Sequence, residues 1–81
     1  MNARIKFSRH ALQRMQERGI TSSEVLATIE ASLHTTYNRD VTISKGLRTN
    51  GHLLIVVFSR GKRIKVITVI DTSKLKKYLD L

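Results

Sequence analysis

Three side chains near the amino terminus have types and a spacing that could support phosphate chemistry. His10, Arg14 and Arg18 are four residues apart, so on a helix they form one stripe. Guanidinium groups bind phosphate through paired hydrogen bonds, and an imidazole can carry a proton near neutral pH. A solvated basic helix face with a histidine packed at its border has the same spacing. The stripe therefore indicates either a phosphate site or a charged surface.

A second concentration of positive charge lies in the carboxyl-terminal half of the chain. The segment between Gly19 and Asn38 contains no Lys or Arg. This polarisation is what a nucleic-acid-binding face requires, although charge that only confers solubility can be distributed in the same way. The second concentration holds nearly half of the 15 Lys and Arg residues, namely Arg60, Lys62, Arg63, Lys65, Lys74, Lys76 and Lys77.

The overall composition favours a polyanionic partner. Fifteen Lys and Arg against six Asp and Glu give a formal net charge of +9, which repels itself in a compact domain. RNA is the first candidate partner because contacts to phosphates release counterions, and an acidic protein is the second. The acidic residues are scattered and none stands at metal-ligand spacing from a histidine, so we expect no metal site and no cofactor.

The same composition predicts a cytoplasmic location. The absence of Cys excludes a disulfide framework and suits a reducing compartment. The segment Met1–Phe7 lacks an apolar signal region, and the longest apolar run, Leu53–Phe58, is too short to span a bilayer. We therefore expect no membrane partner, and a single domain over residues 1–81.

The elements that must position these side chains begin with two helices. Ser8 precedes an apolar stripe and Gly19 suits a helix end, which predicts a helix over Arg9–Arg18. Thr21 opens a capping box, and the helix behind it is expected over Ser22–Ser32.

Extended segments follow the two helices. The runs 35–37 and 41–44 predict two strands or one broken strand, and Asn50-Gly51 predicts a hairpin leading into an apolar central strand, 53–58. A last strand is expected over 62–71, followed by a short basic helix or tail. The predicted fold class is α+β, with two amino-terminal helices packed on an antiparallel sheet of three or four strands.

The segment Phe7–Thr21 resembles the opening of small bacterial proteins grouped as domain-of-unknown-function family 4258. The shared pattern is approximately Ser-x-His-Ala, Arg-Met and Glu-Arg-Gly-Ile with a helix behind it. A weaker resemblance continues through Gly46 to the strand motif Val66–Val69.

This resemblance implies a RelE-like or barnase-like fold and a metal-independent endoribonuclease, often the toxin half of a toxin–antitoxin pair. Its expected catalytic positions are His10, as base or acid, Arg14 and Arg18, and Thr68. Arg14 and one of Arg18 or Arg48 would hold the phosphate, and Thr68 would orient it from the last strand. The expected RNA-binding residues are Arg48, Arg60, Lys62, Arg63, Lys65, Lys77 and Tyr78.

Two hypotheses about function follow from the sequence. The first is a ribonuclease toxin that is neutralised by an acidic antitoxin and that acts on free RNA or on the ribosome. The second is a non-catalytic RNA-binding or protein-interaction module on the same fold, because a complete acid and base pair is not visible in the matched motif. A small acidic partner encoded by a neighbouring gene would favour the toxin.

Overall fold

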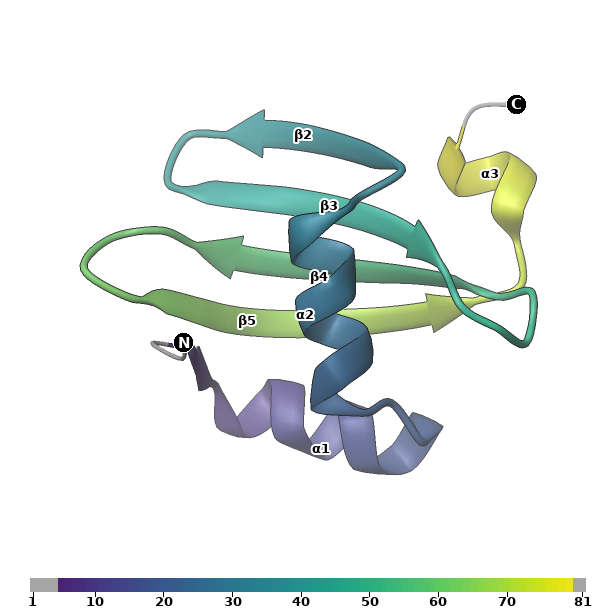
Figure 1. Cartoon of the computed structure of the whole chain (residues 1–81), viewed down its shortest axis with the longest axis horizontal. Coiled ribbons are helices and arrows are strands. Elements are labelled where there is room, and N and C mark those ends of the chain that lie inside the picture. The colour runs from purple at the N-terminus through teal and green to yellow at the C-terminus, as the bar shows by residue number, and fades with distance from the viewer. Residues whose placement is uncertain (1–4, 80–81) are drawn as a thin grey trace.

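The computed structural model describes residues 5–79 as an α+β fold built on one five-stranded sheet (Figure 1). The elements in chain order are β1 (Ile5–Phe7), α1 (Arg9–Arg18), α2 (Ser22–Glu30), β2 (His34–Asn38), β3 (Val41–Leu47), β4 (Leu53–Ser59), β5 (Ile64–Thr72) and α3 (Leu75–Leu79). None of the helices in this described part of the chain is long and apolar enough to cross a membrane.

The sheet is mixed rather than antiparallel. The strand order is β1-β5-β4-β3-β2, and all neighbours are antiparallel except β1, which runs parallel to β5 with Ile5 opposite Ile64. The predicted count of three or four strands was therefore too low, and the predicted all-antiparallel arrangement was wrong. A three-residue strand that pairs with a segment far along the chain leaves no periodic signal in the sequence.

Helix α1 lies along β5 because hydrogen bonds from Ser8 anchor the amino-terminal end of the helix to that strand. The Ser8 hydroxyl donates to the Ile67 carbonyl at 2.6 Å, and the Ser8 amide donates to the Val66 carbonyl at 2.9 Å. The same Oγ accepts the Ala11 amide at 3.0 Å, which caps the helix. Gly19, at φ 63°, ends the helix in the left-handed conformation.

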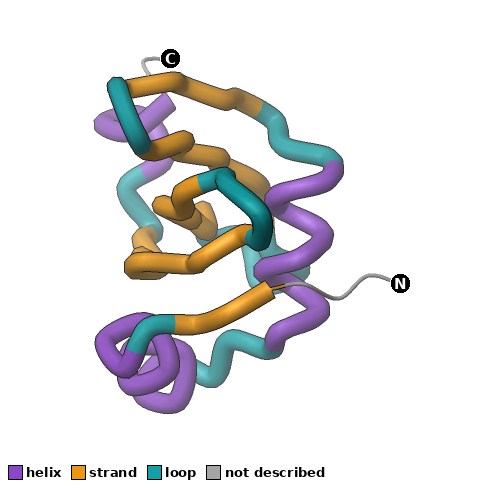
Figure 2. Tube along the Cα trace, turned by 90° about the vertical axis from the view of Figure 1, so that its left-hand side faces the viewer, coloured by secondary structure: helices purple, strands orange, loops and turns teal. Residues whose placement is uncertain are grey.

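Helix α2 crosses one face of the sheet, and the short α3 lies on the other side (Figure 2). The predicted capping box is present: Thr21 Oγ1 accepts the Glu24 amide at 3.1 Å, and Glu24 Oε1 accepts the Thr21 amide at 3.0 Å. Thr28 then packs on Gly46 of β3, where a Cβ would lie 3.4 Å from the threonine side chain. The helix can approach the sheet closely because position 46 has no side chain.

The main core lies between the helices and one face of the sheet. Leu54, Val56 and Phe58 of β4 face the helices and pack with buried residues of α1, α2 and β5. Leu53 and Ile55 alternate to the opposite face and are also buried, which confirms β4 as a central strand covered on both sides. The other buried members of the helix-side cluster are Ala11, Met15, Ile20, Val25, Val66 and Val69.

Candidate functional site

A polar network joins the helices to the sheet at the end where β5 finishes. Its centre is Arg48, in the turn between β3 and β4. Arg48 Nε donates to Glu24 at 2.8 Å, Nη1 to Asp71 at 2.5 Å, and Nη2 to the Gly19 carbonyl at 3.0 Å and to Glu24 at 3.1 Å. One guanidinium thus connects α2, β5 and the turn between the two long helices.

His52 extends this network toward solvent. Its Nδ1 lies 2.8 Å from Asp71 Oδ1, in a pair where the aspartate side chain is 7% exposed and the histidine side chain 42% exposed. A carboxylate that holds one ring nitrogen fixes both the orientation and the tautomer of an imidazole. Nε2 takes no part in this contact.

The network keeps both of its carboxylates ionised. Hydrogen bonds from Arg48 and from the Thr21 amide lower the pKa of Glu24. Burial alone would raise the pKa of Asp71, but its hydrogen bonds with His52 and Arg48 outweigh this effect and hold it below the ordinary value. Asp71 is therefore an acceptor for His52 at neutral pH rather than a protonated acid.

Two arginines of the predicted stripe meet this end of β5. Arg14 and Arg18 line a cleft of about 260 Å³ together with Val69, Ile70 and Asp71. We call it the α1–β5 cleft. Both arginine side chains are exposed, so their guanidinium groups are accessible to an anion. Asp71, which holds His52, is one of the residues that line this cleft.

His10 lies farther back along α1. It lines a separate shallow cleft of about 330 Å³ with Gln13, Arg14 and Glu17, where Gln13 Nε2 donates to Glu17 at 3.3 Å. Arg14 is common to this cleft and to the α1–β5 cleft. His10, Arg14 and Arg18 lie four residues apart on α1, as expected, but His10 and Arg18 line different clefts. Glu17 adds a carboxylate beside His10.

Thr68 lies beside the α1–β5 cleft without lining it. It is half-buried, pairs with Val57, and shares with Ile70 the sheet face opposite the Leu54 side. A bulge at Ile67, where Phe58 pairs with Val66 and Val57 with Thr68, sets this register.

The predicted RNA-binding residues do not form one continuous groove. Arg60, Lys62 and Arg63 lie in the β4–β5 turn, at the opposite end of the sheet from His52 (Figure 1). Lys65 is exposed on β5, whereas Lys77 and Tyr78 belong to α3. Lys45 Nζ donates a hydrogen bond to the Tyr78 carbonyl at 2.7 Å and so ties α3 to β3. Arg48 is predominantly engaged with protein acceptors, and this geometry suits a structural role better than a phosphate contact.

Sequence reasoning missed His52, Asp71 and Glu24 as members of one site. The Asn50-Gly51 signal could have placed Arg48 beside His52, since the Arg48 amide donates to the His52 carbonyl at 2.8 Å across that turn. Nothing local could have added Asp71, because it arrives through the pairing of β4 with β5. Within residues 5–79 no group of three or more His, Cys, Asp or Glu side chains is gathered as metal ligands would be.

Comparisons with known proteins give one match. The family model described as a domain of unknown function (DUF4258) matches residues 7–77. No curated protein and no solved structure matches the chain.

Proposed function

The chain belongs to the DUF4258 family, whose function is unknown. We propose, from the side chains of the chain itself, that it is a metal-independent endoribonuclease acting at the α1–β5 cleft. One observation carries the proposal: Asp71 lines that cleft with Arg14 and Arg18 and also holds His52 at 2.8 Å. The two cations that would bind a phosphate therefore border the residue that orients an imidazole.

The reaction that these groups suit is cleavage of RNA by its own 2′-hydroxyl. A base takes the proton of the 2′-hydroxyl, the 2′-oxygen attacks phosphorus, and the bond to the 5′-oxygen breaks as that oxygen receives a proton. The products are a 2′,3′-cyclic phosphate and a free 5′-hydroxyl. A base, an acid and cations that stabilise the growing charge on the phosphate are sufficient for this chemistry.

We assign His52 as the base, because Asp71 orients its ring. In the neutral tautomer with the proton on Nδ1, the ring donates to Asp71 and offers the lone pair of Nε2 to the 2′-hydroxyl. Asp71 is a positioning residue here, and Arg48 offsets its charge so that the cleft still attracts a phosphate.

Arg14 and Arg18 are the proposed phosphate ligands. Because Arg14 also borders His10, a phosphate held by Arg14 has a second imidazole nearby. We assign His10 as the acid that protonates the leaving 5′-oxygen, which requires that Arg14 hold the phosphate where the two clefts meet. Thr68 does not line the cleft, so we assign the orientation of the phosphate to the two arginines.

Cleavage of a single-stranded RNA by the purified full chain, in the presence of a chelator, tests the proposal. His52→Ala and His10→Ala should each lower kcat/KM by about 100-fold or more, the usual contribution of a general acid or base. His34→Ala is the matched control, because His34 is an exposed histidine on β2, and it should leave the rate unchanged. Wild-type cleavage that survives His52→Ala undiminished would refute the assignment of His52.

The role of Asp71 is separated from simple stabilisation by a pH profile. Asp71→Asn should change the pH dependence of kcat as well as its size, because the amide can donate to Nδ1 and hold the wrong tautomer. A variant that is merely less stable would keep the wild-type pH profile at temperatures below its transition.

A non-catalytic RNA-binding module is the second candidate. It is favoured by the exposure of Arg14 and Arg18, which suffices for phosphate binding without any proton transfer. Salt-dependent RNA binding with no cleavage of free RNA, either alone or after ribosomes are added, would select it over the ribonuclease. Loss of growth on expression, relieved by a small acidic antitoxin, would support the toxin form of the first candidate.

A further inference from the structure

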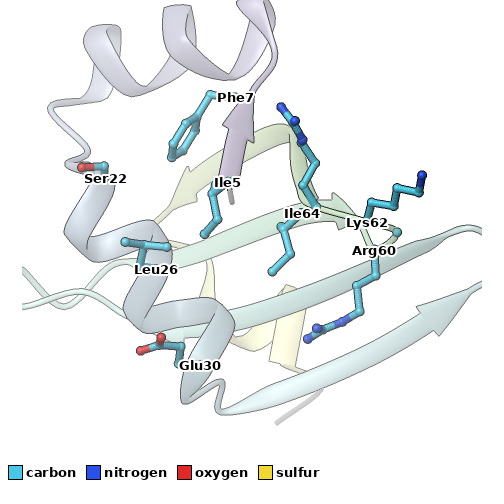
Figure 3. Close-up of a pocket in the computed structure, with 10 residues that line it drawn as sticks. Ile5, Phe7, Ser22, Leu26, Glu30, Arg60, Lys62 and Ile64 are labelled. Carbon is cyan, nitrogen blue, oxygen red and sulfur yellow. The ribbon is translucent and has the colours of Figure 1, made fainter. Parts of the chain in front are cut away.

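A second pocket of the described chain lies away from the α1–β5 cleft. It measures about 680 Å³ and is bounded by β1, α2 and the β4–β5 turn (Figure 3). This volume is well within the range of ligand-binding sites, roughly 300–1,000 Å³. We call it the turn pocket.

The floor of the turn pocket is aliphatic and aromatic. Ile5 and Phe7 of β1, Leu26 of α2 and Ile64 of β5 turn their side chains toward a common space in Figure 3. Leu26 is 36% exposed and the other three are only half-buried. Covering these groups would remove apolar surface from water and stabilise a complex.

One side of the rim is strongly cationic. Arg60, Lys62 and Arg63 all line the pocket and all are exposed. Among the described residues the ion pairs found involve Arg48 and His52 and none of these three cations. The Arg60 guanidinium lies 5.2 Å from the centre of the Phe58 ring, which holds it at the rim.

We propose that the turn pocket binds an acidic peptide segment of a partner protein, with aliphatic side chains on the floor and carboxylates against the cationic rim. Charge complementarity selects this occupant, since three cations border an apolar surface on one side. The arrangement is that of an interface anchor: apolar side chains fill a pocket while charges at its edge set orientation and association rate.

RNA is the less suitable occupant of this pocket. Bases bind single-stranded sites chiefly by stacking on flat aromatic or guanidinium faces, whereas three of the four floor residues are aliphatic. We therefore expect peptide at the turn pocket and RNA at the α1–β5 cleft. The two should bind without competition, because the turn pocket lies at the start of β5 and the α1–β5 cleft near its end.

Selection from a random peptide library displayed on phage, with the full chain as bait, tests the site. Enriched sequences should combine Asp or Glu with Leu, Ile, Val or Phe. A synthetic peptide with the enriched sequence should lose affinity by about tenfold or more against Leu26→Glu, and similarly against a Lys62→Glu, Arg63→Glu double variant.

Matched controls change a similar residue elsewhere. Leu12→Glu replaces an exposed leucine of α1, and Lys76→Glu replaces an exposed lysine of α3. Both should bind the peptide within about twofold of wild type. Circular dichroism melting of each variant confirms that the fold persists.

Three results would overturn the inference. They are the enrichment of no acidic peptide, peptide affinity that is unaffected by Leu26→Glu, and displacement of the peptide by RNA. Self-association of the chain that is abolished by Leu26→Glu would instead identify a second copy as the occupant. None of these measurements depends on RNA cleavage, so this inference and the proposed function fail independently.

Discussion

Replacement of Arg48 by Met tests whether the polar network holds the helices on the sheet. Met preserves much of the aliphatic volume of Arg and removes the charge and every donor. The change eliminates the contacts with Glu24, Asp71 and the Gly19 carbonyl in one step. Because the Arg48 side chain is only 10% exposed, water cannot fully replace the hydrogen bonds that it donates.

The size of the effect follows from the burial of the partners left behind. Removing one member of a buried ion pair costs roughly 3–5 kcal/mol. Asp71 is 7% exposed and keeps only His52, whereas Glu24 is 28% exposed and regains water. We therefore expect the lower end, about 3 kcal/mol. For a domain of this size that corresponds to a decrease in Tm of roughly 12–24 °C.

Urea denaturation at pH 7, followed by far-UV circular dichroism, measures the loss directly. Arg14→Met is the matched control, because Arg14 is exposed, and it should change stability by less than about 0.5 kcal/mol. A double-mutant cycle with Asp71→Asn should give a coupling energy of about 1 kcal/mol or more. If Arg48→Met lowered the free energy of unfolding by less than about 1 kcal/mol with an unchanged m-value, the network would not be what holds the helices on the sheet. Arg48 would then again be a candidate phosphate ligand.

Three further results are expected. The free energy of unfolding should fall as the pH drops below about 4.5, because the folded state lowers the pKa values of Glu24 and Asp71 from their ordinary values of 4.5 and 3.8. The stability that this gives is complete above the ordinary values and is lost as the pH falls through the lower values of the folded state. Urea titrations from pH 7 to pH 3 measure the change, and a flat profile would contradict it. Gly19→Ala should cost about 1 kcal/mol in urea denaturation, since its φ of 63° strains any residue with a Cβ. Replacing Arg14 and Arg18 by Gln should flatten the dependence of log RNA affinity on log salt by about 2, one for each phosphate contact, and an unchanged slope would place RNA elsewhere.

Local chemistry in the sequence determined the helices and the central hairpin. Ser8 and Gly19 bound α1 at the predicted residues Arg9–Arg18, and the Thr21 capping box opens α2, which ends at Glu30 rather than Ser32. The predicted hairpin turn is confirmed with Gly51 at φ 88°. These features are readable because each depends on residues within about one helical turn or one β-turn of each other.

Tertiary structure alone decided the mixed sheet and the site. Strand β1 contributes three residues and gains its place only from β5, which lies 59 residues farther along at the Ile5–Ile64 pair. His52 meets Asp71 because β4 pairs with β5 in a register that puts Leu54 opposite Asp71. Spacing along a single element can reveal a stripe such as that of α1, but side chains from separate strands are brought together by the register of a long-range pairing, which no local pattern encodes.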